Sequence, residues 1–153
     1  MISERKRKWI LGTLGTIIVV TPIVLLNNYT LDRYQKHIKA EVDAGRIQPS
    51  MPVWQHRIAL IYRYTFRDDS ASKAFDQYVQ LFYTLDKDSG NEEAVYRARD
   101  SVWDYAQVLE ETQKRPLAYQ YYVLILSDWP DHPHRAQAEV REHDLRKQGY
   151  GGN

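Results

Sequence analysis

The sequence predicts an all-α protein in which one membrane-spanning helix precedes a domain of helical hairpins. Three observations lead to this fold class. Residues 9–26 contain no charged side chain, apolar residues recur at spacings of three and four through most of the remaining chain, and the 7 glycines and 6 prolines of the 153-residue chain fall mainly where these patterns break. Because no run of alternating β-branched residues lies between turn signals, we expect no strands.

The predicted membrane span runs from Trp9 to Leu26. Its eighteen residues cover about 27 Å as a helix, and the uncharged run continues to residue 31, so the segment is long enough to cross the hydrocarbon layer of a bilayer. Trp9 and Tyr29 lie near the two ends, where aromatic side chains favour the membrane interfaces. No ionisable residue lies inside the span, so we expect no ion or proton path there.

Small residues give this span a surface on which another helix can pack. Gly12 and Thr16 form a small-xxx-small pair with Gly15 close to the same surface, although glycine and threonine are also simply tolerated in lipid. Pro22 removes one backbone hydrogen bond and is expected to kink the helix.

The basic cluster at positions 5–8, followed by an apolar segment, is also typical of a cleaved secretory signal peptide. Residues 25–29 lack the small side chains that a cleavage site needs, which favours an uncleaved, single-pass signal-anchor. The four cations at positions 5–8 outnumber the three on the far flank of the span. We therefore expect a cytoplasmic N-terminus and a helical domain outside the cytoplasm, which is the periplasm if the source is bacterial.

A juxtamembrane helix follows the span. Leu31, Tyr34, Ile38 and Val42 recur on one stripe of this helix, and Gly45 ends it. The chain is thus divided into a basic tail and anchor (1–31), a juxtamembrane helix and linker (32–50), a helical domain (51–149) and a short tail (150–153).

Five further helices are predicted in the helical domain. They cover residues 52–66, 71–85, 92–113, 116–127 and 134–148. Ser70 and Asn91 are the expected caps of the second and third of these helices. The helix at 116–127 is apolar on nearly all sides, so it is either the centre of the domain or meets a partner. The last helix is expected to bury Ala136, Val140 and Leu145.

Two segments of the helical domain can be aligned without gaps. Residues 73–81 align with residues 117–125, so that Ala74 falls on Ala118 and Tyr78 falls on Tyr122. The two alanines are 44 residues apart, and each segment is the second member of a predicted helix pair. Such self-similarity is typical of helical hairpin repeats.

The second hairpin carries a recognisable pattern of large and small residues. It has a large-small pair in its first helix, a small residue opening its second helix, an aromatic residue after that and a proline at the end: Tyr105, Ala106, Ala118, Tyr122 and Pro130. Over residues 102–130 this pattern resembles a tetratricopeptide repeat (TPR), and it is similar to repeats of bacterial periplasmic TPR proteins that assist envelope assemblies.

The first hairpin, residues 58–86, departs from this pattern. Tyr62 stands in place of the small residue in the first helix, and Asp86 in place of the proline. The TPR resemblance implies a scaffold without chemistry of its own, which docks other polypeptides in the groove between stacked helix pairs.

Composition and motifs give no sign of catalysis or of a cofactor. A net charge of +1 provides no basic footprint for nucleic acid, and the absence of cysteine removes disulfides and thiolate metal sites. No Gly-rich phosphate loop, G-x-S-x-G or H-E-x-x-H motif is present. We expect no enzyme, no cofactor and no nucleic-acid partner.

Histidine is the one residue type whose placement suggests metal binding. His132 and His134 flank Pro133, and such a pair could hold a divalent cation. The proline keeps the two side chains apart and no third histidine lies at helical spacing, so we predict exposed loop residues without a metal. His56 is likewise expected on the surface.

Aromatic residues exceed what the predicted inner stripes need. The excess residues, which suit a protein interface but also suit core packing, are Tyr62, Tyr64, Phe66, Tyr83, Tyr96, Trp103, Tyr119 and Tyr121. Five of them are the partner-binding candidates: Tyr64, Tyr96, Trp103, Tyr119 and Tyr121. The sequence therefore predicts a membrane-anchored scaffold or accessory subunit that docks onto a larger membrane complex, with lipid and other membrane subunits as partners. The alternative is a purely structural subunit of a respiratory, photosynthetic or secretion complex, held mainly by its transmembrane helix.

Overall fold

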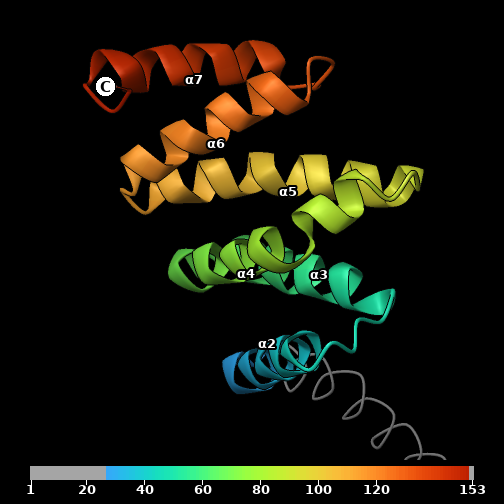
Figure 1. Ribbon diagram of the computed structural model, residues 1–153. Helices are drawn as coiled ribbons and strands as arrows, with labels where there is room; N and C mark the ends of the chain where they lie inside the picture. Colours follow the sequence, from blue (N-terminus) through green and yellow to red (C-terminus); the bar gives the residue numbers. More distant parts are fainter. Residues whose placement is uncertain (1–26, 152–153) are drawn as a thin grey trace, which may run out of the picture. The chain divides into compact units, whose positions relative to one another are not determined.

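The computed structural model describes residues 27–151, which form six α-helices and no strand (Figure 1). The predicted all-α class is confirmed for this part of the chain. Every helix predicted here is present, and its ends lie within three residues of the prediction. The helices are α2 (Asn28–Asp43), α3 (Ser50–Tyr64), α4 (Asp68–Lys87), α5 (Glu92–Glu111), α6 (Arg115–Asp128) and α7 (Arg135–Lys147).

None of the helices between residues 27 and 151 is both long enough and apolar enough to span a bilayer. The predicted span at residues 9–26, with its packing residues Gly12, Gly15 and Thr16 and its kink at Pro22, lies outside the described residues and stays a prediction. Tyr29, at the predicted outer interface, is exposed in the first turn of α2.

The chain divides into two compact units, one ending at His37 and one beginning at Ile38, so the division falls within α2. On this helix Leu31 and Ile38 are buried, whereas Tyr34, which the periodicity places on the same stripe, is exposed. The helix ends at Asp43, two residues before the predicted terminator Gly45, whose φ of 74° lies in the left-handed region that glycine adopts without strain.

In the second unit each helix packs against its neighbours in sequence. α3 packs on α4, α4 on α5, α5 on α6 and α6 on α7, and α3 also touches α5. Turns of three to six residues join these helices. The fully buried apolar side chains of α3 to α6 include Ile58, Ala59, Tyr62, Ala74, Phe75, Tyr78, Phe82, Val102, Leu109, Tyr122 and Ile125.

The last helix buries less than predicted. Val140 is 58% exposed and Ala136 is also exposed, while Ala138 and Leu145 are buried. The reason is that α7 packs only on α6 among the described helices, so only a narrow side of it is covered.

Two helix starts test the predicted caps. The side chain of Asn91 accepts a hydrogen bond from the backbone N–H of Ala94 (3.0 Å), which confirms Asn91 as the cap of α5. The prediction for Ser70 is wrong, because α4 already begins at Asp68 and Ser70 lies in its first turn. Asp68 and Asp69 stabilise that earlier start, since negative charge is favoured at a helix N-terminus.

The turn between α3 and α4 repeats in the turn between α5 and α6. Phe66 and Gln113 both have positive φ, of 56° and 60°. The threonine before each of them is the C-cap of the preceding helix. The backbone hydrogen bond that closes each turn is also the same: the N–H of Arg67 donates to the carbonyl of Tyr62 (2.9 Å), and the N–H of Lys114 donates to the carbonyl of Leu109 (2.7 Å). Equivalent residues of the two turns are 47 positions apart.

This 47-residue shift corrects the alignment made from sequence. It pairs Ala118 with Ala71 rather than with Ala74, and it pairs Ala106 with Ala59, where the sequence comparison placed Tyr62. All four of the alanines paired in this way are fully buried. Small residues therefore lie at equivalent positions of both hairpins, where they let paired helices approach closely.

Candidate docking groove

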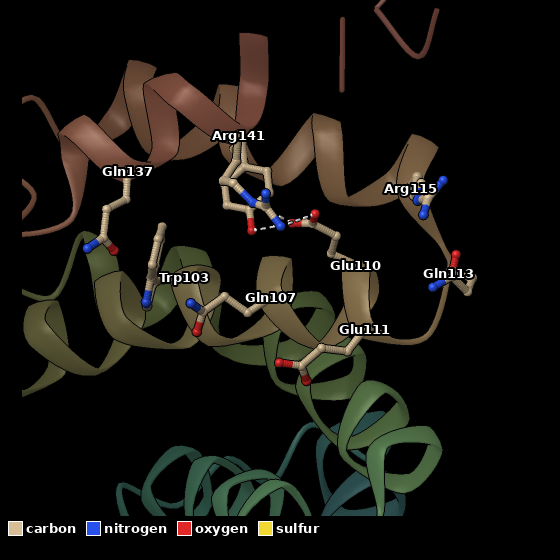
Figure 2. Close-up of a pocket in the computed structure, with 9 residues that line it drawn as sticks. Trp103, Gln107, Glu110, Glu111, Gln113, Arg115, Gln137 and Arg141 are labelled. Carbon is tan, nitrogen blue, oxygen red and sulfur yellow. Dashed lines mark hydrogen bonds and ion pairs between the residues drawn. The ribbon is translucent and has the colours of Figure 1, made fainter. Parts of the chain in front are cut away.

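A groove of about 410 Å³ lies between α5 and α7, with α6 contributing to it (Figure 2). Polar and charged side chains make up most of its lining, and Trp103 and Tyr122 supply aromatic surface. Figure 2 shows Trp103 and Gln137 toward one end, and Gln113 and Arg115 toward the other. The lining residues are Trp103, Gln107, Glu110, Glu111, Gln113, Arg115, Tyr122, Gln137 and Arg141.

Glu110 of α5 links the three helices around the groove. Its carboxylate accepts two hydrogen bonds from the Arg141 guanidinium of α7, one of them from Nε at 3.2 Å, and a third from the Tyr122 hydroxyl of α6 at 3.1 Å. Burial raises the pKa of the Tyr122 phenol, which keeps it protonated as a donor. Glu110, Tyr122 and Arg141 therefore form a fixed part of the groove wall.

A second fixed group holds Gln107 in place. Arg63 of α3 donates to the side-chain oxygen of Gln107, and it also forms an ion pair with Asp104 and donates to the Asp104 backbone carbonyl (3.2 Å). Burial raises the pKa of Asp104 to about 6, and this effect outweighs the opposite pull of the Arg63 charge. The α5 wall is thereby tied to α3 as well as to α6 and α7.

Other polar side chains of the groove have no partner within residues 27–151. The side chains of Glu111, Gln113, Arg115 and Gln137 form no hydrogen bond or ion pair in that part of the chain. An amide side chain offers both a donor and an acceptor, and the glutamate and arginine offer opposite charges. The groove thus presents hydrogen-bond donors, hydrogen-bond acceptors and both signs of charge, beside side chains that are already held in place.

No family model, curated protein or solved structure matches the chain.

The five aromatic candidates do not gather at one place. Trp103 lines the groove but is only 7% exposed, because its indole stacks on His134 with ring centroids 4.7 Å apart and meets Tyr122 edge-on at 5.9 Å. Tyr121 and Tyr119 are half-buried, and Tyr121 packs 4.7 Å from Tyr105. Tyr64 and Tyr96 are exposed elsewhere on the domain.

The residues that carry the predicted repeat pattern lie almost entirely inside the domain. Six of them, Ala74, Tyr78, Tyr105, Ala106, Ala118 and Tyr122, are buried. Pro130 instead lies exposed in the turn between α6 and α7.

The prediction that His132 is exposed is wrong. Its side chain is 5% exposed and packs beside Trp103, and its Nδ1 accepts the backbone N–H of His134 at 2.9 Å. Its Nε2 is buried without a hydrogen-bond partner, and burial lowers the pKa of His132. No cluster of three metal-ligating side chains occurs among the described residues.

His56 was also expected on the surface and is instead partly buried between helices. Its Nδ1 lies 2.7 Å from the hydroxyl of Ser101, and its ring meets those of Tyr78 and Phe75 edge-on. Burial lowers the pKa of His56 to about 4, so the imidazole is neutral at pH 7. A serine next to a neutral histidine is the arrangement of an activated nucleophile, but the Ser101 hydroxyl is fully buried and a substrate cannot reach it.

A larger and more apolar hollow of about 850 Å³ lies where the linker before α3 meets the end of α4 and the start of α5. Ile47, Val53 and Leu85 supply its apolar surface. Two of the polar groups in its wall, Asp86 and Arg97, are already bonded to each other, and Gln48, Asp88 and Glu93 also line it. We take the α5–α7 groove as the candidate for recognition, because a wall fixed by Glu110 and Arg141 there carries four unpaired polar side chains.

Sequence reasoning did not select the polar residues of the groove. A signal for them exists, because Gln107 and Glu111 on α5, and Gln137 and Arg141 on α7, are each four residues apart and so share one helix face. What the sequence does not contain is the pairing of these two faces across the groove.

Proposed function

We propose that the chain is a non-catalytic, membrane-anchored scaffold whose TPR-like helical hairpins dock a polypeptide segment in the groove between α5 and α7. The observation that carries the proposal is the set of unpaired polar side chains, Glu111, Gln113, Arg115 and Gln137, on a wall fixed by Glu110 and Arg141.

An extended polypeptide is the ligand that this lining suits. Each residue of a polypeptide exposes one backbone donor and one acceptor, and the amides of Gln113 and Gln137 can bond to both kinds of group. Glu111 and Arg115 add places for a basic and an acidic side chain. Because Glu110 and Gln107 are already held in place, binding loses less side-chain freedom than it would at a mobile surface.

Two features of the fold support the TPR-like part of the proposal. The α3–α4 and α5–α6 turns share one hydrogen-bonding pattern at a 47-residue shift. The same shift places buried alanines at equivalent positions of both helix pairs, Ala59 with Ala106 and Ala71 with Ala118. Stacked helix pairs leave a groove that suits an extended segment or a helix.

The membrane part of the proposal rests on the uncharged segment at residues 9–26. A single-pass anchor with a cytoplasmic N-terminus would place the helical domain on the non-cytoplasmic side of the membrane. Tethering raises the effective concentration of the groove for segments of membrane proteins at the same surface. A subunit of a larger membrane assembly is therefore the partner that we propose.

The test for the groove uses the full-length protein, purified from its native membrane in mild detergent with the proteins that accompany it at fixed stoichiometry. We expect Gln137→Ala combined with Arg115→Glu to release the partner while circular dichroism shows unchanged helicity. Gln120→Ala on α6 is the matched control, because Gln120 is exposed and does not line the groove. Retention of the partner by the groove variant contradicts docking there.

The anchor has a separate test. Removal of residues 1–26 is expected to move the chain from the membrane pellet to the supernatant after alkaline extraction. If the groove variants keep the partner and Gly12→Leu with Thr16→Leu releases it, the alternative of a structural subunit held by its transmembrane helix is supported instead.

A further inference from the structure

The turn between α3 and α4 presents a phenyl ring to solvent on a strained backbone. Phe66 is 90% exposed, and its φ of 56° lies in the left-handed region that bulky side chains rarely adopt. Its ring makes no aromatic or cation–π contact within the described residues. Both the exposure and the backbone conformation are unfavourable, and no contact of the ring within residues 27–151 compensates for them.

The equivalent turn between α5 and α6 shows that the ring is not needed to form the turn. Gln113 occupies the same position with a φ of 60° and the same backbone hydrogen bonds. The backbone requires a left-handed residue at both places, for which glycine is the least strained choice. A phenylalanine at position 66 therefore serves something other than the fold of the turn.

The surroundings of Phe66 are acidic. A hollow of about 540 Å³ beside the ring is lined by Asp68, Asp69 and Glu111. The one cation in this lining, Arg67, is turned back onto the domain, with its guanidinium 4.9 Å from the Tyr62 ring centre and its Nε bonded to the Thr65 hydroxyl at 2.7 Å. The ring is thus rimmed by negative charge.

We propose that Phe66 is the anchor of a second docking surface, which inserts into an apolar socket rimmed by lysine or arginine on a partner protein. Aromatic anchors that fill a pocket supply much of the affinity of protein interfaces, and complementary charge at the rim speeds association and excludes wrong partners. A symmetric contact with the Phe66 surface of a second copy does not fit, because that surface is equally acidic. An anionic lipid surface is excluded for the same reason.

This surface adjoins the groove, since Glu111 and Gln113 line both hollows, but the inference does not require the groove to be occupied. Different variants test the Phe66 surface and the groove. Phe66→Gly removes the anchor and leaves the groove lining intact, whereas Gln137→Ala with Arg115→Glu does the reverse.

The first experiment places the photo-crosslinking residue p-benzoylphenylalanine at position 66 of the full-length protein in its native cells. The expected result is a cross-link to one protein, at apolar residues that have lysine or arginine beside them. A cross-link to a second copy of the chain, to lipid, or to a site without neighbouring basic residues overturns the proposal, as does the absence of any cross-link.

The second experiment measures affinity and thermal stability for Phe66→Gly with the cross-linked protein as the binding probe. We expect the affinity to fall at least tenfold, while the midpoint of thermal unfolding stays the same or rises by about 1–4 °C because strain is relieved. A residue that serves the fold would give the opposite sign of the thermal shift. Unchanged affinity, or a clear loss of thermal stability, overturns the proposal.

Two controls match this variant. Gln113→Gly relieves the same strain at the equivalent turn and is expected to raise the unfolding midpoint by a similar amount, which calibrates the thermal shift. Val140→Ala removes an exposed apolar side chain on α7, away from the turn, and is expected to leave the affinity within twofold of the unmodified protein. A comparable loss of affinity in Val140→Ala would show that the effect of Phe66→Gly is not specific, and would overturn the proposal.

Discussion

Asp86 and Arg97 form a two-pronged ion pair inside the helical domain. The Nε and Nη2 atoms of Arg97 lie 2.8 and 2.9 Å from the two carboxylate oxygens of Asp86, and the Tyr78 hydroxyl donates a further hydrogen bond at 2.6 Å. Asp86 is only 3% exposed, although it lies just beyond the end of the helix that the sequence predicts at residues 71–85. The pair joins the last turn of α4 to the first half of α5.

Loss of one member of this pair should be costly. Asp86→Ala leaves the Arg97 guanidinium without its carboxylate, and we expect a loss of about 3–5 kcal/mol in the free energy of unfolding. Urea denaturation of the full-length protein in detergent, followed by circular dichroism, measures the change. The matched control is Asp43→Ala, since Asp43 pairs with Lys39 at the surface and should contribute less than about 0.5 kcal/mol. Equal losses in the two variants would contradict the assignment of Asp86 as a buried partner.

His56 should make the domain less stable in acid. Burial lowers the pKa of His56 from 6.5 to about 4, so the unfolded chain binds this proton at a higher pH than the folded domain does. Its contribution is complete above about pH 6.5 and is lost as the pH falls toward 4. Relative to His56→Gln, the unmodified protein should lose about 2–3 kcal/mol between pH 7 and pH 4.

The measurement for His56 is urea denaturation of both proteins at several pH values. The difference between their unfolding free energies removes the contribution of all other titrating groups. Parallel curves from pH 7 to pH 4 would show that the imidazole is accessible to protons in the folded domain.

Asp104 should have the opposite dependence on pH. Burial raises the pKa of this carboxyl from 3.8 to about 6, so its charged form is unfavourable in the folded domain above pH 6. As the pH falls from 7 to 4, the folded domain takes up a proton before the unfolded chain does. Relative to Asp104→Asn, the unmodified protein should therefore gain about 2–3 kcal/mol over this interval. A pH-independent difference between the two proteins would show that the Arg63 ion pair offsets burial, and a loss of stability as the pH falls would show that the ion pair dominates.

The buried alanines at equivalent positions of the two hairpins should not tolerate larger side chains. We expect Ala71→Leu and Ala118→Leu each to lower the unfolding free energy by about 1–3 kcal/mol, because the added carbons have no space between the paired helices. Ala136→Leu on α7 is the matched control, since Ala136 is exposed, and it should change stability by less than about 0.5 kcal/mol. A similar loss in all three variants would mean that helix contacts do not depend on the small residues.

The helices and most of their ends were predictable from sequence because the signals for them are local. Apolar spacing marks α3 to α6, Asn91 caps α5, and Gly45 ends α2 through backbone preferences that act within a few residues. The start of α4 was misplaced because Ser70 is a good cap residue in isolation, whereas two acidic residues extend the helix to Asp68.

The register of the repeat and the candidate groove depended on contacts between distant residues. Sequence identity favoured pairing Ala74 with Ala118. The hydrogen bonds of the two turns instead pair Ala71 with Ala118, because residues at the same place in equivalent turns are 47 positions apart. The Glu110–Arg141 ion pair joins residues 31 positions apart. No local pattern distinguishes either of them from a solvated surface charge.

The sequence by itself thus determined an all-α domain, the positions of its helices and the uncharged segment that precedes it. Only the tertiary structure decided which side chains are buried near the C-terminal end of this domain. Trp103 and His132 are covered because the α6–α7 turn packs back onto α5, and Val140 is exposed because no described helix follows α7 to cover it. Periodicity fixes which residues share a helix face, but burial depends on what packs against that face, and that is set by contacts far apart in the chain.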